Sequence, residues 1–165
     1  MRITELRATP VAITDPPLRS AFGLHEPFAL RTIVEIETDE GISGVSETYG
    51  GEAPLLALHG ARDLVVGLDP WRLAGLRQTL DKPEEGPAKP WEGRGLAPRA
   101  LFSAIEVACL DAVGKAVGRP ACDRLGGKLR DQIPFAAYLF FKHAPRDAED
   151  DWGEVMDEEA LVGEA

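Results

Sequence analysis

Two groups of side chains in this sequence have the chemistry of metal ligands: a pair of cysteines and a run of carboxylates. Cys109 and Cys122 stand in apolar or helical surroundings without a CxxC spacing, which favours reduced structural thiols over a disulfide or a zinc site. Residues 147–164 carry nine negative charges and neither Lys nor Arg, so they lack both a basic partner and a framework that would fix magnesium geometry. We therefore predict no metal ligand among these side chains.

Histidine and aromatic side chains form a second set of candidates, suited to binding a ligand. Taken in isolation, His25 is typical of a loop or surface histidine, and Tyr138 and Phe140 are typical of core aromatics. His59 and His143 have no identifiable partner and are interpreted as surface residues. The residue types alone therefore do not define a binding site.

The balance of charge argues against one class of partner. The 165 residues include 28 acidic and 18 basic side chains, a formal charge of -10, which disfavours binding to a nucleic-acid backbone. Residues 1–146 contribute only -1 of this charge, so the acidity belongs to the C-terminal stretch and is typical of a solvated surface or a disordered end. We expect a cytoplasmic protein, because the first residues offer no secretory apolar region and no stretch is long enough to span a membrane.

The first third of the chain has the pattern of an antiparallel sheet. Strands are predicted at residues 2–14, 28–38 and 42–48, with a long loop over 15–27 and a hairpin turn at Asp39-Glu40-Gly41. A sheet of three strands needs a cover on one face.

Helices supply that cover. We predict helices over residues 53–66, from Asp69-Pro70 to about Leu80, and over 98–117, with a loop over 81–95 and a short turn over 121–125. The helix over 98–117 carries a broad apolar stripe and is predicted to be the buried central helix. Its apolar positions are Leu101, Phe102, Ile105, Ala108, Cys109, Ala112, Val113 and Ala116.

The last 35 residues differ in pattern from the rest of the chain. Residues 133–141 are apolar enough for a strand buried on both faces, as in a parallel sheet, and a helix is predicted from about Asp157. The sequence thus predicts an α+β fold, a three-stranded antiparallel meander packed on a helical bundle, followed by the start of a β/α layer.

Two segments carry a resemblance to a known family. Residues 103–120 (SAIEVACLDAVGKAVGRP) and 125–130 (LGGKLR) resemble the end of the capping domain in the mandelate racemase and muconate lactonizing enzyme branch of the enolase superfamily. The resemblance implies a capping domain over residues 1–130, followed over 131–165 by the first unit of an incomplete (β/α)8 barrel. Within the longer segment, Asp111 is interpreted as a structural carboxylate with its hydrogen bonds satisfied, not as a catalyst.

Three shorter segments narrow the resemblance to glucarate dehydratases. They are residues 20–28 (SAFGLHEPF), 47–52 (ETYGGE) and 138–141 (YLFF), with 93–96 (GRGL) as a weaker fourth. The capping loops of that family close over the barrel mouth and grip an aldarate diacid, while the barrel holds Mg2+ and the acid/base residues. The resemblance also implies a homo-oligomer when the protein is complete.

Position by position, the resemblance assigns four substrate-binding residues. His25 matches a substrate-contacting histidine, and Ser20 falls where the family usually has asparagine. Tyr138 and Phe140 match aromatic residues at the end of the first barrel strand. Imidazole and hydroxyl groups can hydrogen-bond a sugar acid, Arg94 offers a bidentate fork, and an aromatic ring can pack on the carbon chain.

The family's barrel carries a Lys-x-Lys pair, three carboxylate metal ligands and a His-Asp pair, and none of these has a counterpart in this sequence. We therefore predict no catalytic residue in this chain. A whole barrel needs about 250 residues. Three interpretations remain: the N-terminal portion of a magnesium-dependent glucarate-type dehydratase, inactive alone; a non-catalytic capping module or remnant; or the front end of a related acid-sugar dehydratase or epimerase. The first two differ in whether a barrel belongs to the same protein.

Overall fold

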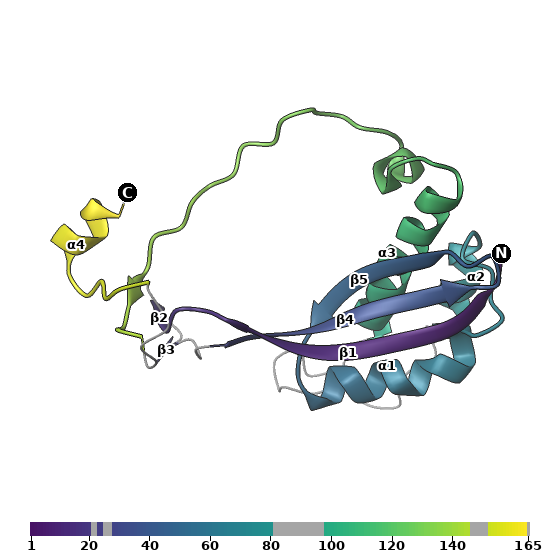
Figure 1. Ribbon diagram of the computed structural model, residues 1–165, viewed down its shortest axis with the longest axis horizontal. Coiled ribbons are helices and arrows are strands. Elements are labelled where there is room, and N and C mark those ends of the chain that lie inside the picture. The colour runs from purple at the N-terminus through teal and green to yellow at the C-terminus, as the bar shows by residue number, and fades with distance from the viewer. Residues whose placement is uncertain (21–22, 25–27, 81–97, 146–151, 165) are drawn as a thin grey trace. The chain divides into compact units, whose positions relative to one another are not determined.

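The chain folds into two compact units. The computed structural model describes residues 1–20, 23–24, 28–80, 98–145 and 152–164 (Figure 1). The first unit comprises Met1–Val11 and Leu30–Leu129, and the second comprises Ala12–Ala29 and Arg130–Ala165. We describe each unit by itself. The segment 12–29 groups with the C-terminal residues although it includes the end of one strand of the N-terminal sheet and the start of another.

A three-stranded sheet forms one layer of the first unit. Its strands are β1 (Ile3–Thr14), β4 (Phe28–Thr38) and β5 (Ser43–Tyr49), in the order β1-β4-β5. Strands β4 and β5 pair antiparallel from Arg31↔Tyr49 to Glu37↔Ser43. The start of β1 lies beside the end of β4, where the Asp39 amide donates to the Arg2 carbonyl at 2.9 Å. The predicted meander is confirmed.

Strand β4 shows why this sequence makes a sheet. From Thr32 onward it alternates fully buried with half-buried residues, and Thr32, Val34 and Ile36 face the core. This is the period of two that β-branched residues favour on a half-buried sheet. Gly41 in the following turn has a φ of 72°, a left-handed conformation that glycine adopts without strain.

Helices cover one face of this sheet (Figure 1). They are α1 (Glu52–Val65), α2 (Leu73–Leu80) and α3 (Pro98–Ala116), followed by the 3-10 helix η1 (Ala121–Leu125). The apolar stripe predicted for α3 is buried or half-buried along its length. The core contains Ile3, Leu6, Val34, Ile36, Leu58, Ala61, Val65, Leu76, Leu80, Phe102, Ala104, Ile105, Ala108, Cys109 and Ala112.

The predicted start of the second helix is wrong by three residues. Asp69 does not cap α2, because its carboxylate accepts from the Trp71 amide at 3.1 Å and its carbonyl accepts from the Arg72 amide at 2.9 Å. These bonds close a separate turn. The helix begins at Leu73, after that turn has used the capping groups of Asp69. The predicted loop over 81–95 lies outside the described residues.

Helix α3 packs on β5 at very short range. A Cβ placed on Gly44 would lie 2.8 Å from the Ala112 nitrogen and 2.9 Å from the Ala112 Cβ, and closer still to the Ala108 carbonyl oxygen. Only a glycine fits there. The close approach lets side chains of α3 reach the outer edge of β5.

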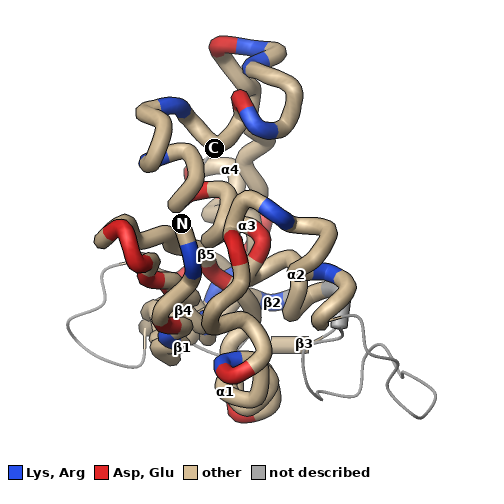
Figure 2. The backbone as a smooth tube through the Cα atoms, turned by 90° about the vertical axis from the view of Figure 1, so that its right-hand side faces the viewer, with Lys and Arg blue, Asp and Glu red and all other residues tan. Residues whose placement is uncertain are grey.

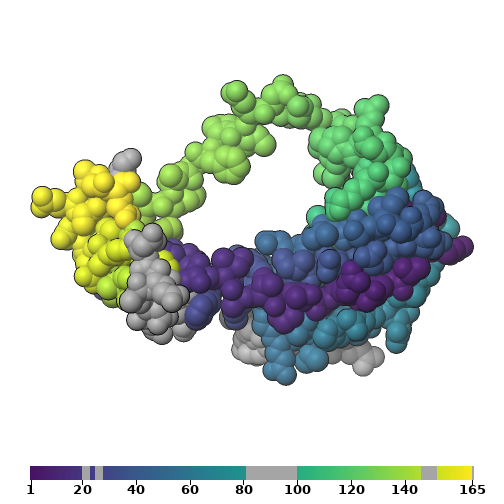
Figure 3. All heavy atoms as spheres, viewed as in Figure 1, coloured from purple at the N-terminus to yellow at the C-terminus, as the bar shows by residue number. Residues whose placement is uncertain are grey.

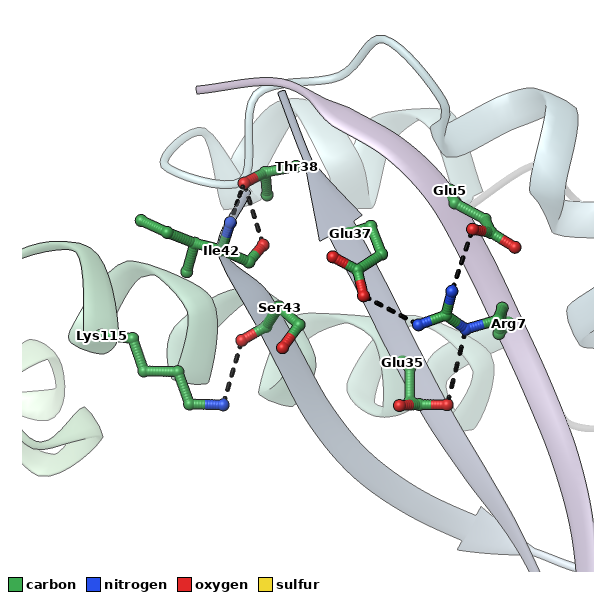
Figure 4. A network of polar contacts seen from close by, with 8 residues as sticks. All are labelled: Glu5, Arg7, Glu35, Glu37, Thr38, Ile42, Ser43 and Lys115. Carbon is green, nitrogen blue, oxygen red and sulfur yellow. Dashed lines mark hydrogen bonds and ion pairs between the residues drawn. The ribbon is translucent and has the colours of Figure 1, made fainter. Parts of the chain in front are cut away.

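Two of those side chains bind the backbone of β5. The Asp111 carboxylate accepts from the Val45 amide at 2.9 Å. The Lys115 ammonium donates to the Ser43 carbonyl at 3.0 Å, a contact drawn in Figure 4. Asp111 and Lys115 also pair with each other at 2.7 Å. Strand β5 is an edge strand, so one side of its backbone has no neighbouring strand. These contacts satisfy an N–H and a carbonyl group on that backbone, which would otherwise be available to pair with another strand.

The second unit contains a smaller sheet. Its strands are β2 (Leu18–Ser20), β3 (Gly23–Leu24) and β6 (Phe141–Lys142), in the order β3-β2-β6, and its helix is α4 (Glu158–Gly163). The predicted loop over 15–27 therefore contains two short strands. The helix predicted from about Asp157 is confirmed, and the Asp157 carboxylate caps it by accepting from the Ala160 amide at 2.8 Å.

The strand predicted over 133–141 is wrong for most of its length. Only Phe141 and Lys142 are in a strand, and every residue from 131 to 140 is exposed (the green chain in Figure 3). A strand buried on both faces needs neighbours on both edges, and among the described residues no strand pairs with 133–140. The apolar pattern therefore indicates that this segment can pack between apolar neighbours. It does not indicate that this chain supplies those neighbours.

Candidate substrate-capping site

Pairing of β2 with β6 brings together two segments that the sequence analysis had singled out separately. The register is Leu18↔Lys142 and Arg19↔Phe141, antiparallel. Ser20 follows Arg19 at the end of β2 and Phe140 directly precedes Phe141 of β6, so both stand next to the same end of this pairing. Residues 120 positions apart in sequence thus come to one place in the second unit.

The two aromatic residues of this segment lie against each other and face solvent. The rings of Tyr138 and Phe140 stack with centroids 6.3 Å apart and planes inclined by 27°. Tyr138 is 80% exposed and Phe140 is 38% exposed. Their interpretation as core aromatics, which the residues alone favoured, is wrong for this chain. The pair offers an aromatic surface to a ligand or to a packing partner.

Three predicted polar groups of the site are not among the side chains that the structure describes. His25 lies outside the described residues, as does Arg94, and the side chain of Ser20 is likewise not described. The residue before His25, Leu24, pairs with Arg19 in the β2–β3 hairpin. The assignments of His25, Ser20, Tyr138 and Phe140 to substrate binding remain predictions.

A set of contacts that the sequence did not reveal fixes β6. Lys142 exchanges two backbone hydrogen bonds of 2.9 Å with Val155, which is buried, and its ammonium pairs with the Glu164 carboxylate. On the other side the His143 amide donates to the Pro17 carbonyl at 3.1 Å. No motif signals these long-range pairs. They anchor the segment directly after Phe140.

In the first unit, charged side chains on the exposed face of the sheet pair with one another. Arg7 lies between Glu5, Glu35 and Glu37, with nitrogen–oxygen distances of 3.0, 3.6 and 2.8 Å (Figure 4). The hydrogen bond to Glu37 is the main cause that raises the pKa of Arg7. These are structural surface pairs. Asp111, bonded to Val45 and Lys115, is confirmed as a carboxylate with its hydrogen bonds satisfied.

The described residues do not fit a magnesium site. Nowhere in the described part of the chain do three or more His, Cys, Asp or Glu side chains gather closely enough to hold a metal ion. The two cysteines are free, and burial raises the pKa of Cys109 to about 12, with a smaller contribution from Glu106. Within the same described ranges, no helix is both long and apolar enough to cross a membrane.

Comparison with known families identifies the family to which the chain belongs. Residues 3–126 match the mandelate racemase / muconate lactonizing enzyme N-terminal domain. The chain belongs to this family. The match covers nearly all of the first unit together with the segment 12–29, and it ends at Gly126, directly after η1.

Relatives in the family are longer than this chain. It is 36% identical over 181 residues to a probable glucarate dehydratase of Streptomyces coelicolor, an alignment that covers 100% of this chain and 42% of the relative. It is 35% identical over 109 residues to a D-galactonate dehydratase of Variovorax paradoxus, covering 64% of this chain and 27% of the relative. The chain therefore spans about two fifths of the curated relative that it matches throughout.

A solved structure shares the fold along almost the whole chain. An enolase from Pseudomonas fluorescens, solved with magnesium, potassium and tartrate, superposes with a TM-score of 0.82 and 40% identity, over 99% of this chain and 42% of that one. The capping fold of the enolase superfamily is thereby shown. Magnesium is bound by that neighbour.

Proposed function

We propose that this chain is the substrate-capping portion of a magnesium-dependent, glucarate-type acid-sugar dehydratase. In the whole protein it would close over an aldarate diacid, from which a hydro-lyase removes water. His25 and Ser20 would hydrogen-bond the diacid, and Tyr138 and Phe140 would pack against its carbon chain. The magnesium ion would be held by parts of the protein outside this chain.

The observation that carries the proposal is the pairing of β2 with β6. It joins β2, which ends at Ser20 five residues before His25, to β6, which directly follows the stacked Tyr138 and Phe140. Segments assigned to one substrate by resemblance thus belong to one structural unit. The similarity of this whole chain to two fifths of a probable glucarate dehydratase and the tartrate in a solved neighbour support a hydroxy diacid as the substrate class.

Two other functions compete with this one. The similarity to a D-galactonate dehydratase favours a related acid-sugar dehydratase, although that alignment covers only 64% of the chain. A non-catalytic capping module is the second alternative; the lack of a metal cluster among the described residues is expected of it and of the proposed dehydratase portion alike. Both alternatives share the fold and differ in what the whole protein does.

A chimera tests the proposal. This chain would replace the matching N-terminal part of the Streptomyces coelicolor relative, and dehydration of glucarate and of galactonate would be measured with magnesium. We expect the chimera to dehydrate glucarate, and the chain alone to show no turnover above a control without protein. A folded chimera that is inactive on both acids supports the module, and one that prefers galactonate supports the related dehydratase.

The role of His25 in substrate binding is tested in the same chimera, with a second histidine of this chain as the control. His25→Ala should lower kcat/KM for glucarate by about tenfold or more, because a substrate hydrogen bond to a charged group is lost. His59→Ala is the control, since His59 is exposed on α1 in the first unit. Equal kinetics for the two variants would remove His25 from the site.

A further inference from the structure

The contacts that anchor β6 lie directly after the exposed aromatic pair. Residues 131–140 are exposed, and among the described residues no strand pairs with them. Strand pairing of this segment begins at β6, where Phe141 pairs with Arg19 of β2. The position of Tyr138 and Phe140 relative to β2 therefore depends on how firmly β6 is held.

Lys142 is the residue of β6 that has strand partners on both sides. On one side it pairs with Leu18 of β2. On the other side its amide and its carbonyl each bond Val155 at 2.9 Å, and Val155 is 4% exposed. Lys142 thus stands between two antiparallel neighbours, and a shift of its backbone would disturb both pairings.

The side chain of Lys142 carries a charge although little of it reaches solvent. It is 13% exposed, and its ammonium pairs with the carboxylate of Glu164 at the end of α4, a side chain that is 34% exposed. A charged group with so little access to water needs a partner, and loss of that partner leaves an uncompensated charge. The ion pair therefore ties the end of α4 to β6.

Lys142 is also the only Lys or Arg in the described part of the chain after Arg130. Residues 131–145 and 152–164 contain this one lysine and six carboxylates (Figure 2, where basic positions are blue and acidic positions red). The six are Asp131, Glu154, Asp157, Glu158, Glu159 and Glu164. Within these ranges, no second Lys or Arg could take the place of Lys142 beside Glu164.

We propose that Lys142 is a positioning residue of the candidate substrate-capping site. By holding β6 between β2 and Val155, it sets the place of Tyr138 and Phe140 relative to the segment that leads through β2 and β3 to His25. It acts through β6 and not by contact with the substrate. The effect on substrate binding rests on the proposed function, whereas the contacts of Lys142 do not.

Amide exchange in the isolated chain tests the contacts. The amides of Lys142, His143 and Val155 each donate a bond in this anchor, and we expect them to exchange about tenfold faster in Lys142→Met than in the natural chain. Methionine keeps an apolar stem and removes the charge. The amides of β4 should stay protected in the variant, as evidence that the first unit is folded.

Arg119→Gln is the control for this measurement. It breaks an ion pair on the surface of the first unit, between Arg119 and Asp123, in which the arginine is 71% exposed. Exchange at the three amides should then change by less than about twofold, because a surface pair contributes little and lies outside the second unit.

Kinetics of the chimera test the consequence for the substrate. Lys142→Met and Glu164→Gln should each raise KM for glucarate by about five- to tenfold while kcat falls by less than about twofold, because binding side chains are displaced and the reacting groups are not. The double variant should raise KM no further than the larger single change, since both substitutions break one contact. Arg119→Gln should leave both constants unchanged.

Two results would overturn the proposal outright: equal exchange of the three amides in the natural chain and in Lys142→Met, or an unchanged KM in an active chimera that carries Lys142→Met. A loss confined to kcat would also contradict it, because the effect would then fall on the reaction and not on binding. If the chimera with the natural chain dehydrates neither acid, the proposed function fails. The exchange measurement then still decides whether Lys142 holds β6 in place.

Discussion

The two units of this chain differ in the burial of their apolar side chains. In the first unit the sheet and helices bury a continuous core in which Ile3, Ile36 and Ile105 are at most 1% exposed. In the second, Ile133, Phe135 and Tyr138 are 66%, 91% and 80% exposed. Residues of similar hydrophobicity thus stabilise one unit and leave surface open in the other. The capping fold contains its own packing partners, and the segment 131–140 lacks them among the described residues.

A matched pair of isoleucines tests this contrast with the largest expected effect. Ile105→Ala removes a fully buried side chain of α3 and should lower the free energy of unfolding by about 2–5 kcal/mol, because a cavity remains. Ile133→Ala should change it by less than about 0.5 kcal/mol, because that side chain is already exposed. Urea unfolding followed by circular dichroism measures both. Similar losses for the two variants would mean that residues near 133 have a packing partner in solution.

The contact between α3 and β5 is the next test. Gly44→Ala forces a methyl group against the backbone of Ala108 and Ala112 and should cost about 1–3 kcal/mol of stability. Gly60→Ala, inside α1 with nothing near its added Cβ, should instead be neutral or stabilise by up to about 1 kcal/mol. Thermal melting of the two variants compares them. A Gly44→Ala protein as stable as the natural one would refute the close approach.

The edge contacts of β5 should give a smaller effect. Asp111→Ala leaves the Val45 amide without its partner and removes the ion pair with Lys115, which should cost about 1–2 kcal/mol. Asp63→Ala, an exposed carboxylate on α1, is the control and should stay within about 0.5 kcal/mol. Amide exchange at Val45 should accelerate only in the first variant. If both aspartates behave alike, Asp111 does not protect the edge.

The two cysteines should differ in their reactivity toward a thiol reagent. The ionisation of Cys109 should have little effect on the stability of the protein at neutral pH. Cys109 is buried with a pKa raised to about 12, so we expect it to stay unmodified by a thiol reagent at pH 8, while the half-buried Cys122 reacts. A raised thiol pKa favours the protonated form in the folded state. The associated stability is therefore complete below pH 9, the ordinary value, and is lost as the pH rises from 9 toward 12. Labelling of both thiols in the native protein would show that α3 opens readily.

Sequence reasoning succeeded where a pattern is local. The alternation in β4 and the apolar stripe of α3 gave their bounds to within a residue, because each pattern reports burial against a neighbouring layer of the same unit. The start of α2 was missed because Asp69 forms a turn of its own. The strands β2 and β3 were missed because they are only three and two residues long.

The candidate site was accessible mainly through family resemblance. Nothing in the residues near Ser20 or Tyr138 indicates that β2 pairs with β6, since strand pairing between distant segments leaves no local pattern. The exposure of residues 131–140 could not be predicted either, because their composition matches a buried strand. Composition indicates which surfaces prefer burial, while topology determines whether a partner reaches them.

Hydrogen exchange along residues 131–140 tests most directly whether this chain is a capping portion that a barrel completes. In the isolated chain we expect these amides to exchange almost as fast as in an unfolded peptide, while those of β4 and α3 are protected. In the chimera with the remainder of the Streptomyces coelicolor relative, the same amides should become protected. Protection already present in the isolated chain, or its absence in an active chimera, would contradict the account.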